Sequence, residues 1–208
     1  GLAKIKKKKL TMSIVATLFL SSFTFAQHEN THQPTKITIQ QIDSILLANM
    51  VDAKHAESFN KLVIQDAGGR MKPAHTFASE LVRKVSKTEK FKDMEPSQVL
   101  LSIIENPRLW YEVPVIYLEK GNTEIRKLIG ISATSKYAAL SDFLTPMGVY
   151  KIKEEVAEAQ KKKEKNKFEK DIIKIDRRIG LLYSAIFGGI LKIYPIPNDE
   201  NNKWVSQP

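Results

Sequence analysis

Residues 168–194, FEKDIIKIDRRIGLLYSAIFGGILKIY, form a long amphipathic run. Apolar residues recur along it at the spacing of an α-helix, and its expected buried face comprises Ile172, Ile175, Ile179, Leu182, Ile186 and Leu191. The charged D-R-R at residues 176–178 lies too centrally for a membrane span, which needs about 20 apolar residues. We therefore predict a core helix, with Gly188 and Gly189 marking either a bend or a close backbone approach.

The preceding sequence predicts further helices and a few short strands. A capping box at Thr38 and Gln41, a start at Asp52, a first-turn proline at Pro96 and a cap at Asn122 each indicate a helix. Residues 137–144 and the highly charged residues 151–165 are also expected to be helical, and residues 115–118 to form a strand. We expect a mainly α domain with a few short β-strands over residues 38–194, followed by an irregular tail at 195–208.

The N-terminal region combines a basic flank, residues 1–9, with the apolar stretch LTMSIVATLFLSSFTFA, residues 10–26. This stretch has the features of a retained transmembrane helix or of a secretory signal cut after Ala26; a buried soluble helix fits it worse, because it has no polar face. The chain starts without Met, which favours a retained helix in a longer protein. The lysines favour the cytoplasmic side for the flank. We therefore expect a membrane-tethered domain on the extracytoplasmic, periplasmic side.

The composition argues against several kinds of partner and chemistry. Five of the 33 basic residues lie in the flank, which has no acid, so 28 basic residues face 23 acidic ones elsewhere. This mild excess does not predict nucleic-acid binding, which uses a concentrated basic face. Because the chain has no cysteine, it forms no disulfide and offers no thiolate to a metal.

A literal H-E-x-x-H, formed by His28, Glu29 and His32, lies in the polar residues 27–37. On a helix this spacing places two imidazoles beside a zinc ion, with the glutamate as general base. Here Pro34 interrupts any such helix, and no third ligand is apparent. We interpret residues 27–37 as a solvated linker and predict neither a metal site nor a catalytic site there.

Residues 61–76, KLVIQDAGGRMKPAHT, are the most distinctive stretch. They predict a strand at 62–64, a tight turn that uses glycine at positive φ, and a helix over 77–85. One interpretation is a structural corner bridged by Asp66 and Arg70; the other is an exposed loop that presents the cations Arg70 and Lys72 to a carboxylate. The residues expected to shape this motif are Asp66, Gly68, Gly69, Pro73 and, as helix N-cap, Thr76.

Trp110 is a third candidate contact residue. It lies in NPRLWYEVP, between two prolines. Its ring is suited to stacking on haem or on a peptide, and equally to filling the core, which is the commoner role of a tryptophan in such a position.

Three stretches resemble the system II cytochrome c biogenesis proteins of the fused ResB/CcsA type: LVIQDAGGRMKPAHTFASELVRKVSK, PSQVLLSIIENPRLWYEVPVIYL and ILKIYPIPNDENNKW. The resemblance runs in order from about Leu62 to Trp204. It implies an extracytoplasmic segment between two membrane portions of a protein that exports haem and attaches it to apocytochrome c, a cytochrome c synthase. The family's Trp-rich haem motif is absent, and no histidine here matches its haem ligands.

The resemblance implies a supporting role in which this segment docks apocytochrome c or supports the haem site. Its partners would be the membrane, the remaining membrane portions of the same protein and apocytochrome c. We expect no tight haem binding by residues 32–208 themselves, so haem would be handled by the full protein. The alternative is an independent exported binding module released by signal cleavage.

Overall fold

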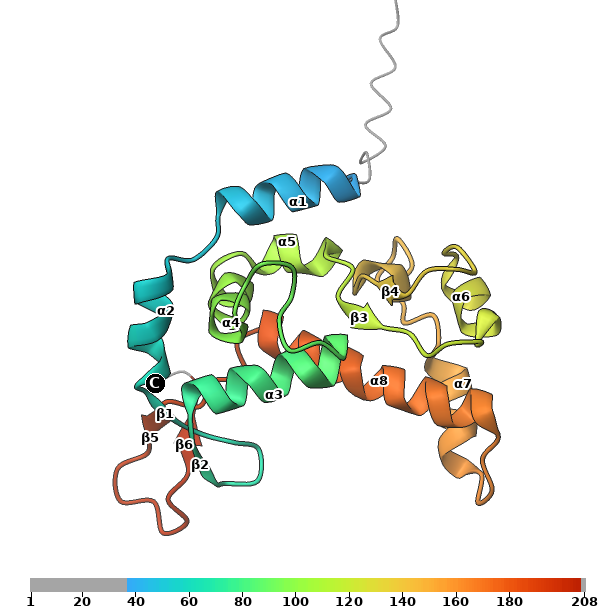
Figure 1. Ribbon diagram of the computed structural model, residues 1–208. Helices are drawn as coiled ribbons and strands as arrows, with labels where there is room; N and C mark the ends of the chain where they lie inside the picture. The colour runs from blue at the N-terminus through green and yellow to red at the C-terminus, as the bar shows by residue number, and fades with distance from the viewer. Residues whose placement is uncertain (1–36, 207–208) are drawn as a thin grey trace, which may run out of the picture. The chain divides into compact units, whose positions relative to one another are not determined.

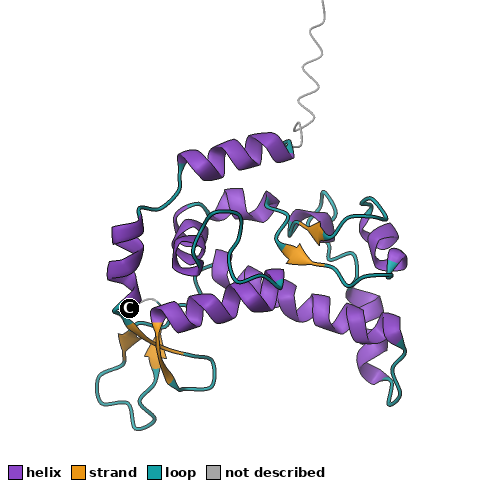
Figure 2. Cartoon of the chain, in the orientation of Figure 1, coloured by secondary structure: helices purple, strands orange, loops and turns teal. Residues whose placement is uncertain are grey.

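Helices dominate residues 37–206, the part of the chain that the computed structural model describes (Figures 1 and 2). The predicted fold class, mainly α with a few short strands, is confirmed for these residues. The helices are α1 (Ile39–Ala48), α2 (Ala53–Asn60), α3 (Ala74–Ser86), α4 (Pro96–Glu105), α5 (Pro107–Glu112), α6 (Thr123–Ile129), the 3₁₀ helix η1 (Ser141–Phe143), α7 (Lys153–Lys161) and α8 (Lys167–Ile186). The strands are β1 (Val63–Gln65), β2 (Met71–Pro73), β3 (Ile116–Tyr117), β4 (Tyr137–Ala138), β5 (Tyr194–Pro195) and β6 (Trp204–Val205).

Helix α8 packs against elements from most of the described chain. It contacts α3, α4, α5, α6, α7 and β3, and Figure 1 shows it running below α5, from beside α3 and α4 to α7. Five of the six predicted apolar positions, Ile172, Ile175, Ile179, Leu182 and Ile186, are buried. Its start is set by a capping box, in which Asn166 Oδ1 accepts a hydrogen bond from the Glu169 N–H at 2.9 Å.

The helix ends earlier than the sequence pattern predicted. It stops at Ile186, and Gly188 adopts a positive φ of 74° immediately beyond it. A left-handed residue turns the chain away from the helix axis and is favourable for glycine. Leu191 therefore packs against the core from the following segment and not from α8.

Helices α3 and α4 form the second layer of the core. α4 begins at Pro96 as predicted, and Val99, Leu100 and Ile103 are buried. Ile104, the next residue of the helix, is 38% exposed. Because α3 and α4 contact each other and α8, the start of α3 and the strand before it are held against the core.

The strands form three separate antiparallel pairs, β1–β2, β3–β4 and β5–β6. Two sequence predictions are corrected here. Residues 137–144 are not one helix: Ala138 pairs with Ile116, and only residues 141–143 are helical. The tail at 195–208 was expected to be irregular, yet Pro195 pairs with Trp204. Both errors arise because a two-residue strand is defined by its partner and not by its own composition.

Arg178, near the middle of α8, makes its hydrogen bonds inside this domain. Arg178 is only 4% exposed. Its guanidinium donates to the Tyr117 carbonyl and to Glu119 Oε1, both at 2.7 Å. Within residues 37–206, no helix has the length and apolar character that a membrane crossing requires. Residues 10–26 and the H-E-x-x-H lie outside the described residues.

Two glycines with equally open surroundings separate helix propensity from backbone strain. An added Cβ would meet nothing within 4 Å at Gly180, inside α8, or at Gly130, which ends α6 with φ of 78°. We predict that Gly180→Ala raises the free energy of unfolding by about 0.5–1 kcal/mol, because alanine is the better helix former. Gly130→Ala should lower it, because alanine is disfavoured at positive φ. Urea unfolding of the full chain measures both changes. A lower free energy of unfolding for Gly180→Ala would contradict the placement of Gly180 at an open position inside α8.

Candidate partner-binding site at the glycine turn

Residues 66–70, here called the glycine turn, join β1 to β2. The Asp66 carboxylate accepts hydrogen bonds from the backbone N–H groups of Gly68 at 2.8 Å and Arg70 at 3.0 Å. Gly69 has φ of 81°, so the expected positive φ occurs at this position. The predicted bridge between Asp66 and Arg70 therefore exists, but it uses the backbone of Arg70 and leaves its guanidinium outward.

Lys72 does not point freely into solvent as the sequence suggested. It pairs with Ile64 across the hairpin, and paired residues project from the same face of a sheet. Ile64 is fully buried on that face, so the Lys72 stem is directed towards the core and α3. Its ammonium lies 2.9 Å from Glu80 Oε2 and 3.1 Å from Asp66 Oδ2. Arg70 is therefore the exposed cation of the glycine turn.

The start of α3 differs from the prediction. The helix begins at Ala74 with Pro73 as N-cap, which places Thr76 inside the first turn. Pro73 has an extended backbone, and the Ala74 N–H donates to the Leu62 carbonyl at 2.9 Å. The hairpin thus passes directly into the helix, and Pro73 and not Thr76 is the boundary residue.

Ionic contacts shift the pKa values of the three charged residues. The Arg70 N–H, followed by the Lys72 ammonium, lowers the pKa of Asp66. The Lys72 ammonium is also the main cause of the lowered pKa of Glu80. In turn, hydrogen bonds to Glu80 and then to Asp66 raise the pKa of Lys72. All three groups are therefore held in their charged forms at neutral pH.

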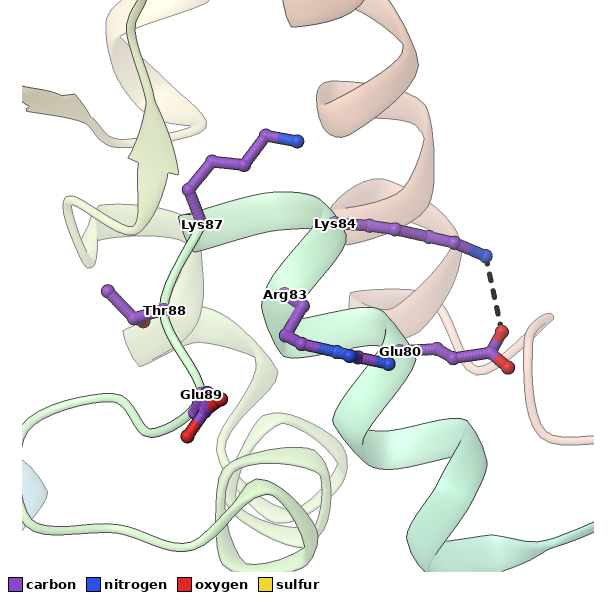
Figure 3. A pocket seen from close by; sticks show the side chains of 6 residues that line it. All are labelled: Glu80, Arg83, Lys84, Lys87, Thr88 and Glu89. Atoms are coloured by element: carbon purple, nitrogen blue, oxygen red, sulfur yellow. Dashed lines mark hydrogen bonds and ion pairs between the residues drawn. The ribbon is translucent and has the colours of Figure 1, made fainter.

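Two grooves adjoin this ionic cluster. One, of about 280 Å³, is lined by the glycine turn, α3, the end of α8 and the segment after it. The other, of about 460 Å³, lies at the C-terminal end of α3 and shares Glu80 and Lys84 with the first. Figure 3 shows its side chains, with Lys84 bonded to Glu80. Arg83 and Lys87 are exposed there and have no ionic partner within residues 37–206.

Gln65 is a positioning residue that the sequence did not reveal. Its side chain is 4% exposed and donates from Nε2 to the carbonyls of Gly69 at 3.2 Å and Asn202 at 2.8 Å. Its Oε1 accepts from the Trp204 N–H at 2.8 Å. The glycine turn is therefore tied to the β5–β6 hairpin, more than a hundred residues further along the chain.

Trp110 is removed from the candidate contact residues. It is fully buried, its Nε1 donates to Ser102 Oγ at 2.9 Å, and its ring lies 5.6 Å from that of Phe91. A buried indole whose N–H is satisfied fills space in the core. The core interpretation of this residue is the one that the structure supports.

The described histidines, His55 and His75, are exposed on α2 and α3. Within residues 37–206, no group of three His, Asp or Glu side chains is arranged to hold a metal ion.

No protein-family model matches the sequence. The chain is similar to Protein NrfI of Wolinella succinogenes. The two sequences are 30% identical over 153 residues, which make up 73% of this chain and 17% of NrfI. The chain thus spans about one sixth of the length of NrfI. The match to NrfI is consistent with the family resemblance found in the sequence.

Substitution of Gly69 tests the backbone of the turn. Because no atom lies within 4 Å of an added Cβ, a side chain there causes backbone strain and no clash. We predict that Gly69→Val lowers the free energy of unfolding by about 1–3 kcal/mol. Gly69→Asn should cost less, since asparagine tolerates the left-handed region. Equal losses for the two variants, measured by urea unfolding, would refute this explanation.

The ionic cluster predicts a stability that depends on pH. The pKa values of Asp66 and Glu80 lie below their unfolded values of about 3.9 and 4.3, so their stabilisation is complete above those values and is lost as the pH falls through the folded pKa values. The raised pKa of Lys72 has the opposite sign, with loss at alkaline pH. We expect the melting temperature to fall below about pH 4. Glu80→Gln should reduce the slope of melting temperature against pH in this acidic range. An unchanged slope would contradict the stabilising role of the ionic cluster.

Proposed function

We propose that this chain is an extracytoplasmic part of a membrane-bound system II cytochrome c biogenesis protein, which exports haem and attaches it to apocytochrome c. The observation that carries this proposal is the ordered resemblance between about Leu62 and Trp204, together with the similarity to NrfI over 73% of the chain. The basic flank and apolar residues 10–26 support a membrane tether with the domain on the periplasmic side.

Within that protein, we assign the domain the task of docking apocytochrome c at the glycine turn. The turn is held rigidly by Asp66, Gln65 and the Lys72–Glu80 pair. Arg70 is exposed, and its guanidinium has no partner within residues 37–206. An unpaired guanidinium on a fixed backbone is suited to a carboxylate or a peptide carbonyl, because its ordering before binding reduces the entropy cost.

We further propose that haem is handled elsewhere in the full protein. In the resembled family the haem-ligand histidines lie in membrane helices, and none of the four histidines here matches them. The domain would then act on the polypeptide substrate, while the membrane portions of the same protein act on haem.

Arg70→Ala tests the docking role. The substitution removes an exposed cation, so the free energy of unfolding should change by less than about 0.5 kcal/mol. We expect the yield of holocytochrome c in cells that depend on the full protein to fall about two- to fivefold, the effect of losing one rim charge. Arg70→Glu should lower the yield further, because it places a like charge against a carboxylate.

Lys127→Ala on α6 is the matched control, since it also removes one exposed cation. Its holocytochrome yield should equal that of the unchanged protein at equal expression. Lys72→Ala is unsuitable as the principal test, because it also breaks the contacts with Asp66 and Glu80. Normal maturation by both Arg70 variants would exclude the glycine turn as the docking site.

A further inference from the structure

A third groove lies between α5 and the end of α8 and has no part in the proposed docking at the glycine turn. Its volume is about 330 Å³, and its lining residues are Pro107, Arg108, Tyr111, Ile186 and Phe187. We call it the aromatic groove. Such a volume is at the lower end of the range for ligand pockets, about 300–1,000 Å³, and suits one large side chain.

Two exposed aromatic rings lie at this groove, Phe187 in its lining and Tyr183 stacked on Phe187. Phe187 is 60% exposed and Tyr183 50%, and their ring centroids lie 4.3 Å apart. They lie on successive turns of the end of α8, so the backbone holds them in register. Most of the apolar surface of the two stacked rings is exposed to water, which is unfavourable. A partner that buries this surface gains binding free energy.

Polar groups without partners surround this apolar surface. Within residues 37–206, the Arg108 guanidinium and the hydroxyls of Tyr111 and Tyr183 make no hydrogen bond or ion pair with other side chains or the backbone. Burial is the main cause of the raised pKa of Tyr111, so its hydroxyl remains a donor at neutral pH. Arg108 is the only charged residue among those that line the groove. A ligand that fits must therefore be apolar at its centre and negatively charged at one edge.

We propose that the aromatic groove binds an extended peptide segment of a partner protein in which a large apolar side chain stands beside an aspartate or glutamate. The apolar side chain fills the groove against Phe187 and Ile186, and the carboxylate meets Arg108. The two tyrosine hydroxyls donate to main-chain carbonyls, which an extended peptide presents at regular spacing. Aromatic residues and arginine are enriched at protein–protein interfaces and among the residues that contribute most to binding.

The groove is distinct from the glycine-turn site although both use the end of α8. Leu181 and Ser184 line the glycine-turn groove, whereas Ile186 and Phe187 line the aromatic groove. A substitution in the lining of one groove therefore tests binding there without changing the lining of the other groove. The proposal does not depend on the role in cytochrome c biogenesis.

Three short peptides test the proposal with the full chain. They are acetyl-Gly-Phe-Glu-Gly-amide and its analogues with glutamine in place of glutamate and alanine in place of phenylalanine. We expect the first to bind, as measured by calorimetry or by NMR shifts of groove residues. Each analogue should bind at least about tenfold more weakly, since a charge-assisted hydrogen bond or a buried aromatic ring typically contributes that factor or more.

Matched variants locate the site. Arg108→Ala should weaken the Phe-Glu peptide about tenfold while leaving the weak binding of the glutamine analogue unchanged. Phe187→Ala should also weaken it, and because this ring is largely exposed, the melting temperature should be preserved. Arg83→Ala removes an exposed arginine from another groove and should change nothing.

Three outcomes of these peptide measurements would overturn the proposal. The first is no binding of the Phe-Glu peptide at about 10 mM, a concentration well above the dissociation constant expected of such a short ligand. The second is equal affinity for the glutamate and glutamine peptides. The third is an equal loss of affinity in the Arg83→Ala and Arg108→Ala variants. Tight binding of haem at the groove, abolished by Phe187→Ala, would likewise show a different ligand.

Discussion

The fold depends on burying one face of α8. Five apolar side chains along it are removed from water, each contributing about 1.5–3 kcal/mol, and a helix of that length has no stable alternative that leaves such a stripe exposed. Helices α3, α4, α5 and α7 all contact it. Because α8 ends at Ile186, the residues that follow it line two different grooves. Gly189 and Lys192 lie beside the glycine turn, and Phe187 lies beside α5.

Two buried arginines organise the polar part of the core. Arg178 joins α8 to β3 through the Tyr117 carbonyl and Glu119. Arg126, 5% exposed, donates to the carbonyls of Asn122 at 2.6 Å and Ser135 at 2.7 Å and so holds the loops around α6. Buried charges are costly unless fully hydrogen-bonded. These hydrogen bonds stabilise the region around β3 and β4 and also set the positions of its loops.

The glycine turn illustrates how one arrangement supports both structure and proposed function. Asp66 satisfies two backbone N–H groups and the Lys72 ammonium, while Gln65 connects the turn to the C-terminal hairpin. A small hairpin is marginally stable alone, so these contacts explain its order. Because the contacts of Asp66, Gln65 and Lys72 hold the turn, the exposed Arg70 lies on a fixed backbone. A docking residue needs such a fixed position.

The sequence by itself determined most of the helices and the core face of α8. Helical spacing and local caps, such as Thr38 with Gln41 and Pro96 in a first turn, are local signals and therefore survive in the fold. It also indicated the need for positive φ in the turn, which falls on Gly69. The family resemblance likewise rested on continuous stretches of sequence.

Tertiary structure alone decided the properties that depend on distant partners. One interpretation of the sequence made Lys72 an exposed cation, but strand pairing directs it to Asp66 and Glu80. The tail forms a strand because Trp204 and Pro195 pair, and Gln65 is buried where the Asn202 carbonyl and the Trp204 N–H meet its side chain from the far end of the chain. The aromatic groove requires α5 and α8 to meet. These contacts join residues from fewer than ten to more than a hundred positions apart. In each case the path of the folded backbone decides which partner a side chain meets, and local propensity and periodicity do not specify that path.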